Sequence, residues 1–249
     1  MTDTSVSISL VERRSYNNKD AHNIAEGVWW TGYADEDNGR AYNTFLLIDN
    51  QEAVLINPGS RNEKTHKAIK SKITSKINLK QIRHIIISHS DPDISAAAPL
   101  FEKTADRNVQ VYTPAEMAES VHHYGGRNPI IGLRNGDSVI LKSGRTIDFH
   151  ETPQMGKIGP GFFYDSYTGT VFVGNIFGCF QPPWNLFAPH KGYENITPCY
   201  EDSKISRKSL IQAINKIEKL SPRRVCLQNG PIIEDDIDQY FNAVRRLGE

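Results

Sequence analysis

The sequence predicts an α/β fold in which two β-sheets pack between helices in a single domain. Short segments rich in β-branched, aromatic and other apolar residues recur along the chain and have the composition of strands. Longer segments with apolar residues three or four positions apart have the period of amphipathic helices. Their order is compatible with two sheets covered by helices, and 249 residues are ample for the core of such a domain.

The first half of the chain supplies most of the predicted strands and the first long helix. Strands are predicted over residues 27–33, 42–48, 53–56, 85–87 and 109–112. Residues 64–77 are predicted to be helical because isoleucines recur every four positions, and their lysines are expected to form a solvated face. Residues 96–103 should form another helix, and Pro114 opens a further one, since proline is favoured in the first helical turn.

The second half repeats the alternation of strands and helices. Strands are predicted over residues 146–150, 162–165, 170–173 and 224–227, and helices over residues 203–220 and 233–247. Residues 177–187 are apolar but contain two prolines, which is typical of a loop packed over something, such as a lid. Residues 1–24 are polar and are predicted to be a loosely held arm, which leaves residues 25–249 as the folded domain.

Composition excludes several classes of partner. Lys+Arg and Asp+Glu both number 29, and basic residues form no pattern interleaved with aromatic ones, so neither nucleic acid nor a membrane surface is an expected partner. No apolar run approaches the roughly 20 residues of a membrane span, and the first residues lack the apolar core of an export signal. Cys179, Cys199 and Cys226 form no C-x-x-C motif, so buried thiols and a cytoplasmic location are expected.

One stretch concentrates potential metal ligands. The apolar run from Ile85 to Ile87 reads as a buried strand, and His89, Asp91 and Asp93 follow it at alternating positions. Alternation in an extended segment would place the three side chains on one side, at the strand end where α/β folds carry their sites. The alternative is a turn followed by a helix that Asp93 caps. Spacing alone does not separate these interpretations.

Several segments, taken together and in order, resemble one family. They are residues 43–48, 54–59, 87–93, 144–145, 152–153, 171–178 and 229–231. The set resembles the metallo-β-lactamase-fold domain of flavodiiron proteins, and in particular the stand-alone oxygen-binding diiron proteins, which use His-x-Asp-Pro-Asp. The resemblance covers residues 25–247 and implies an αββα sandwich with a two-iron site at the sheet edges. Members act as oxygen or nitric oxide reductases when joined to a flavodoxin domain, and as oxygen or iron sensors without one.

The resemblance assigns few of the family's metal ligands to this chain. His89 and Asp91 match ligands of the first iron and Asp93 matches a ligand of the second. Ile94 stands where many flavodiiron proteins have histidine, although the stand-alone branch also tends to lack it.

Other ligand positions are substituted. Gly156 or Ile158 falls where a histidine is expected, Asn175 aligns with the carboxylate that bridges both metals, and Asn229 aligns with the final histidine. Asn57 stands where the family usually carries aspartate.

These substitutions weaken any metal site. Two divalent ions bring four positive charges, and an amide is a much poorer bridging ligand than a carboxylate. Zinc and non-haem iron sites normally need about three protein ligands. We therefore expect no tightly bound cofactor, with iron or zinc as the cofactor if the site is functional. A hydrogen-bonded network in which Asn175 and Asn229 donate to Asp91 and Asp93 is the expected replacement.

The sequence thus favours a non-catalytic sensory or binding module with an unidentified small ligand or protein partner. The alternative is a metal-dependent hydrolase, or a non-haem iron protein that handles oxygen or nitric oxide, using a residual site of His89, Asp91 and Asp93. His150 and His190 are candidate replacement ligands, although lone histidines are more often structural or solvated. An apolar ligand under residues 177–187 is a weaker hypothesis than ordinary core packing. Family members are often dimeric, so the resemblance also implies a homodimer.

Overall fold

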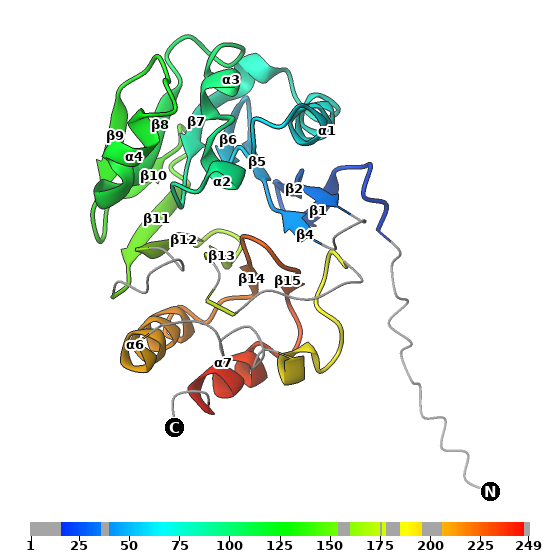
Figure 1. Cartoon of the computed structure of the whole chain (residues 1–249), viewed down its shortest axis with the longest axis vertical. Coiled ribbons are helices and arrows are strands. Elements are labelled where there is room, and N and C mark those ends of the chain that lie inside the picture. Colours follow the sequence, from blue (N-terminus) through cyan, green and yellow to red (C-terminus); the bar gives the residue numbers. More distant parts are fainter. Residues whose placement is uncertain are drawn as a thin grey trace, which may run out of the picture.

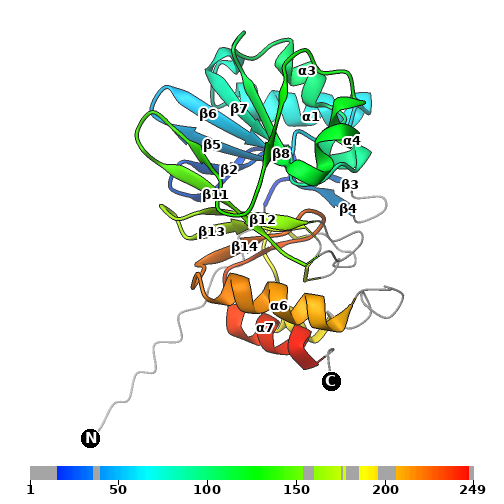
Figure 2. The same cartoon turned by 90° about the vertical axis from the view of Figure 1, so that its left-hand side faces the viewer.

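The protein is an αββα sandwich, in agreement with the predicted fold class. The computed structural model describes residues 16–35, 40–153, 160–174, 176–177, 185–195 and 206–246. Two sheets face each other, helices α1, α3 and α4 cover the outer side of the first, and helices α6 and α7 cover the outer side of the second (Figures 1 and 2). None of the helices in these ranges combines the length and the apolar character needed to cross a membrane.

The first sheet has seven strands in the order β1-β2-β5-β6-β7-β8-β9. They are β1 (His22–Ala25), β2 (Val28–Trp30), β5 (Phe45–Asp49), β6 (Glu52–Ile56), β7 (Ile82–Ile86), β8 (Gln110–Pro114) and β9 (Ile130–Leu133). Strands β1 to β6 pair antiparallel, whereas β6, β7, β8 and β9 pair in parallel. The connections between the parallel strands contain α1 (Glu63–Thr74), α2 (Pro92–Ser95), α3 (Ala98–Glu102) and α4 (Ala118–His122), with short 3₁₀ turns at Leu79–Gln81 and Ala115–Met117.

The second sheet has six strands in the order β10-β11-β12-β13-β14-β15. They are β10 (Ser138–Ile140), β11 (Thr146–Glu151), β12 (Gly161–Asp165), β13 (Thr170–Phe172), β14 (Arg224–Cys226) and β15 (Ile232–Ile233). Its outer face carries α6 (Arg207–Glu218) and α7 (Ile237–Arg246), and a 3₁₀ turn spans Gly192–Asn195. Strands β3 (Tyr33–Asp35) and β4 (Arg40–Tyr42) form a separate two-stranded ribbon.

Three apolar clusters join the layers. Between the sheets, the rings of Phe45 and Phe172 lie 5.2 Å apart and pack β5 against β13. A second cluster lies under α1 and includes Ile69, and a third lies under α6 and α7. On β12, Phe163 belongs to the cluster between the sheets and Phe162 to the cluster under the helices. Successive side chains of a strand point to opposite faces, so each central strand serves two layers.

The structure corrects three sequence predictions. The segment predicted to be helical from residue 233 begins as strand β15, because Ile232 and Ile233 pair with β14 and are fully buried. The helix predicted over residues 96–103 starts only at Ala98, as α3, because the Ala97 N–H donates to Gly59 O at 2.9 Å instead of to a carbonyl of the preceding helix α2. Strand β1 starts at His22 and buries Ile24, so the folded domain begins before residue 25.

Candidate functional site

The strand order brings several strand ends to one edge of the molecule. In the first sheet β6, β7 and β8 are parallel and end at the same edge, where the antiparallel β5 begins. In the second sheet β11, β13 and β14 end together, since β12 is antiparallel to both of its neighbours and β13 is parallel to β14. The backbone N–H of Asn43, just before β5, donates to the Gln228 carbonyl after β14 at 3.1 Å. The two edges therefore meet, and residues beyond these strand ends share one site.

The loop after β7 carries His89, Asp91 and Asp93. His89 is 6 % exposed, and its Nδ1 lies 3.3 Å from both the backbone nitrogen and Oδ1 of Asp91. Its Nε2 is buried and has no hydrogen-bond partner among the described residues. Asp91, not Asp93, occupies the N-cap position of α2, with Pro92 at the first helical position. The three residues therefore do not alternate along an extended segment, because Pro92 starts a helix that contains Asp93.

Asn57 holds the start of this loop. It has a left-handed backbone (φ 55°), and its Oδ1 accepts the Ser88 N–H at 2.9 Å while its own N–H donates to Ile86 O at 2.8 Å. Asparagine tolerates this conformation better than most residues. The substitution of the family's aspartate by Asn57 thus leaves an oxygen that accepts the loop's backbone N–H.

Asn229 supplies an amide donor to the same place. Its Nδ2 donates to Ala41 O at 3.0 Å and lies 3.4 Å from Asp93 Oδ2. A carbonyl only accepts, so the contact with Ala41 fixes which end of the amide faces the carboxylate. Burial raises the pKa of Asp93, although hydrogen bonds from its own backbone and from Asn229 oppose the shift. The expected hydrogen bond between Asn229 and Asp93 is present.

Asn43 connects the two sheets beside Asn229, a role that its place in a family segment alone does not reveal. The side chain is 5 % exposed, accepts the Trp30 indole N–H at 2.8 Å, and donates to the carbonyls of Leu227 and Gly230 at 2.7 Å each. All the hydrogen-bonding capacity of its amide nitrogen is used to hold the loop between β14 and β15. This loop carries Asn229, so Asn43 determines where that residue lies.

Replacing Asn43 by alanine is expected to lower the free energy of unfolding by about 2–4 kcal/mol, because it removes three buried side-chain hydrogen bonds, one from the Trp30 indole and two to backbone carbonyls. Urea unfolding followed by circular dichroism measures the loss. The control is Asn242→Ala on α7, whose side chain is exposed and should change stability by less than about 0.5 kcal/mol. Equal losses in the two variants would show that the Asn43 hydrogen bonds do not hold the loop.

Of the remaining predicted site residues, the two that the structure describes, His150 and His190, make contacts elsewhere. Gly156, Ile158 and Asn175 lie outside the described residues. His150 stacks on Phe162 with ring centroids 5.0 Å apart on the face covered by α6, and burial lowers its pKa. His190 lies 3.2 Å from an oxygen of Asp236 at the start of α7.

The apolar segment predicted as a lid is described only in part, since residues 178–184 lie outside the described ranges. Phe177 is fully buried and packs against Phe241 of α7 with ring centroids 5.8 Å apart. The Ala188 N–H donates to Ile232 O of β15 at 2.8 Å, so the far end of the segment is tied to the second sheet. Ordinary core packing, the interpretation favoured from the sequence, accounts for these described parts.

A two-metal centre needs several side-chain donors that converge on each ion. In the part of the chain that the structure describes, no three His, Cys, Asp or Glu side chains are grouped so that they could hold an ion. A metal ion binds to atoms that offer it a lone pair. Asn229 instead directs an amide N–H toward Asp93, and an N–H offers no lone pair to a metal ion. The described residues therefore do not fit the dinuclear site that the family resemblance implies.

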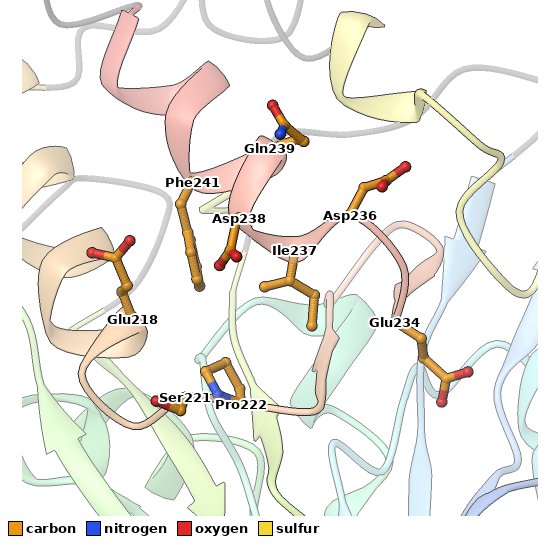
Figure 3. Close-up of a pocket in the computed structure, with 9 residues that line it drawn as sticks. All are labelled: Glu218, Ser221, Pro222, Glu234, Asp236, Ile237, Asp238, Gln239 and Phe241. Carbon is orange, nitrogen blue, oxygen red and sulfur yellow. The ribbon is translucent and has the colours of Figure 1, made fainter.

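A separate hollow of about 530 Å³ lies beside α6 and the start of α7 (Figure 3). Its lining includes the four carboxylates of Glu218, Glu234, Asp236 and Asp238. Arg245, Arg224 and His190 each lie against one of them, at Glu218, Glu234 and Asp236 respectively. Three of the four carboxylates therefore already have a basic partner within the protein, and ion pairing explains why these acidic residues gather around the hollow.

The sandwich with its site at the shared sheet edge defines a metallo-β-lactamase-fold domain. Residues 41–230 match the family described as ODP family beta lactamase, and the chain belongs to that family. The resemblance inferred from the sequence segments is therefore confirmed at the level of family and fold.

Three relatives illustrate how far the sequence has diverged from similar proteins. Putative diflavin flavoprotein A 1 of Nostoc sp. (strain PCC 7120) is 22% identical over 216 residues, which cover 84% of this chain and 36% of that protein. The chain thus spans little more than a third of this relative. The apo state of the chemotaxis sensor ODP from T. denticola has a TM-score of 0.75 and 20% identity, covering 90% of this chain and 92% of that one. A peroxy diiron species of the chemotaxis sensor ODP has a TM-score of 0.72 and 19% identity, with 92% of both chains covered.

Proposed function

We propose that this chain is a non-catalytic sensory or binding module that keeps the metallo-β-lactamase fold without a tight dinuclear metal site. The observation that carries the proposal is the Asn229 amide, which donates toward Asp93 where the family resemblance places a metal ligand. The substitutions Asn175 and Gly156 point in the same direction, since one removes the bridging carboxylate and the other offers no side-chain donor.

The missing ligands weaken the binding of both metal ions that the family resemblance implies. His89 and Asp91 would remain for the first and Asp93 for the second, fewer than the roughly three protein ligands that stable zinc and non-haem iron sites use. A full structural zinc site is worth on the order of 10 kcal/mol, and that stabilisation falls as ligands are removed. With tight metal binding lost, the fold remains as a scaffold for a ligand or partner that needs no metal.

A second candidate function is a metal-dependent hydrolase or a non-haem iron protein that handles oxygen or nitric oxide. The observation in its favour is Nε2 of His89, which is buried and unpartnered among the described residues and is free to bind an ion. The related structure of a peroxy diiron species supports the chemistry for that protein. For this chain the ion would be held by His89, Asp91 and Asp93, whose side chains would have to converge on it, because the described structure does not group them around one point.

Metal content separates the two candidates. Protein purified after growth with iron and zinc is expected to contain far less than one metal ion per chain by mass spectrometry of the elements, because the ligand set is incomplete. A stoichiometric single ion that is lost on His89→Ala would establish the second candidate. Two ions per chain would contradict the first candidate outright.

Putting the family's ligands back into this chain should restore metal binding. The triple variant Gly156→His, Asn175→Asp, Asn229→His is expected to bind iron or zinc, since it returns two imidazoles and the bridging carboxylate. The control variant Asn229→Leu removes the amide without adding a ligand and should remain metal-free. Equal metal content in the wild-type protein and the triple variant would contradict the proposed role of the substitutions.

A further inference from the structure

Lys72 buries its ammonium where α1 meets the chain after β2. The residue is 2 % exposed, whereas lysine is almost never fully buried unless it is paired with an acid. The ammonium donates to the Gly32 carbonyl and lies 4.0 Å from the centroid of the Trp30 ring. An ammonium carries three N–H donors, and Gly32 O is the one hydrogen-bond acceptor that the described residues offer it. These contacts replace only part of the water that the charged form loses.

Neighbouring charges do not offset this cost. The charge of Asp20, before β1, attracts the ammonium, but burial outweighs it and lowers the pKa of Lys72 from 10.5 to about 7. Strand β2 and the two residues after it carry no titratable side chain. The other titratable groups of the surrounding elements face aromatic rings: His22 of β1 stacks on Trp30, and on α1 Lys64 lies over Tyr33 and Lys76 over Trp29.

The carbonyl that holds Lys72 belongs to a ribbon, defined here as residues 31–35 and 40–44. The ribbon leaves the first sheet after β2 and returns to it at β5, and the Thr31 N–H donates to Thr44 O at 2.9 Å where its two ends meet. Between these ends β3 and β4 pair with each other and with neither large sheet. The ribbon can therefore move about its joined ends without breaking a ladder of either large sheet.

Gly32 couples the buried ammonium to the shared sheet edge. A Cβ at Gly32 would lie 2.8 Å from Nε1 of Trp30, so the ribbon backbone covers the indole N–H. That N–H donates to Asn43, which holds the loop bearing Asn229. Asn229 itself donates to Ala41 O on β4 of the ribbon. Movement of the ribbon would thus loosen the contacts that position Asn229.

We propose that Lys72 is a pH-dependent latch for the ribbon, so that proton uptake by its amine releases the ribbon and proton loss closes it against the shared sheet edge. Opening returns water to a charged ammonium, whereas a neutral amine gains much less from water. The inference goes beyond the proposed function and holds with or without a metal ion.

The direction of the pH dependence follows from proton binding. In the open form Lys72 is hydrated and regains its ordinary pKa of 10.5, whereas in the closed form its pKa is about 7. Between these values the open form keeps the proton that the closed form releases. Each pH unit in this window should therefore reduce the open population about tenfold, and below pH 7 the population should level off.

Solvent exchange of the Trp30 indole proton, followed by nuclear magnetic resonance from pH 6.5 to pH 8.5, measures the opening. Relative to free indole at the same pH, its protection should rise about tenfold from pH 7.5 to pH 8.5. In Lys72→Met the protection should not change with pH. The matched control Lys76→Met, which removes the exposed lysine over Trp29, should keep the wild-type slope.

Two further measurements separate the latch from other causes. The backbone amide of Val54, fully buried on β6, exchanges with global unfolding and should be far more protected than the Trp30 indole. Direct titration of the Lys72 side chain in the wild-type protein should give a midpoint well below that of Lys76.

Several results would overturn the inference. They are a Trp30 protection that does not change with pH, a slope that persists in Lys72→Met, and Trp30 exchange as slow as that of Val54 at every pH. A Lys72 midpoint as high as that of Lys76 would also overturn it, and this measurement does not depend on the folding of any variant.

Discussion

Replacing Asp165 by asparagine is expected to cost about 3–5 kcal/mol of stability, because it leaves a buried guanidinium without its counter-charge. The side chains of Arg145 and Asp165 are 6 % and 0 % exposed and form two hydrogen bonds, Nε–Oδ1 at 3.0 Å and Nη2–Oδ2 at 2.5 Å. Thr168 adds a third hydrogen bond to the same carboxylate. The pair fastens the start of β11 to the end of β12, so its loss should loosen the second sheet.

Guanidinium chloride unfolding at neutral pH measures the loss in Asp165→Asn. The matched control is Glu218→Gln, which removes the partner of Arg245 at the surface, where Glu218 is 42 % exposed. Exposed pairs contribute about 0–1 kcal/mol, so this control should be nearly neutral. The double variant Arg145→Met with Asp165→Asn should regain part of the loss, since no buried charge then remains. Similar losses in Asp165→Asn and Glu218→Gln would refute the argument.

Local sequence pattern predicts the elements whose side chains alternate between two fixed environments. The isoleucine period predicts α1, and Ile69 and Ile73 are indeed fully buried. The apolar runs on either side of the Gly169 turn predict the β12–β13 hairpin. The predictions fail where a distant contact decides the structure. Ile233 falls in the segment predicted to be helical, but its pairing with Val225 of β14 makes it part of a strand.

The site residues likewise fall into those that the sequence predicts and those that depend on distant contacts. The grouping of His89, Asp91 and Asp93 after a buried strand can be read from the sequence, because it depends on neighbours in the chain. Asn43 cannot be found this way, since the carbonyls that it binds are 184 and 187 positions away. The amide orientation of Asn229 likewise depends on the Ala41 carbonyl, 188 positions away. Such roles arise only when the two sheets close on each other.

Replacing Lys72 by methionine is expected to stabilise the protein, by an amount that depends on pH. Lys72 is 2 % exposed, its ammonium donates to Gly32 O, and it lies 4.0 Å from the centroid of the Trp30 ring. Burial lowers its pKa from 10.5 to about 7, although the charge of Asp20 opposes the shift. Below pH 7 the folded and unfolded states both hold the proton, so the folded state bears the full cost of a buried charge.

The sign of the pH dependence follows from proton binding. Between pH 7 and pH 10.5 the unfolded chain keeps the proton that the folded chain releases, so wild-type stability should rise with pH across this window. The limiting slope is about 1.4 kcal/mol per pH unit. Methionine cannot titrate, and it leaves Gly32 O without its donor at a cost of about 1 kcal/mol. Lys72→Met should therefore be more stable than wild type by a few kcal/mol at pH 6, and the difference should vanish or reverse by pH 10.

Urea unfolding of the two proteins from pH 6 to pH 10 isolates this contribution, because other titrating groups cancel in the difference. Lys76→Met is the matched control. Lys76 stands one turn further along the chain and lies 4.3 Å from the Trp29 ring centroid, but it is exposed. Its removal should shift stability by less than about 1 kcal/mol and by the same amount at every pH in this range. A Lys72→Met difference that stays constant with pH would show that the ammonium is hydrated in the folded protein, and that the Trp30 ring and the Gly32 carbonyl do not replace its water.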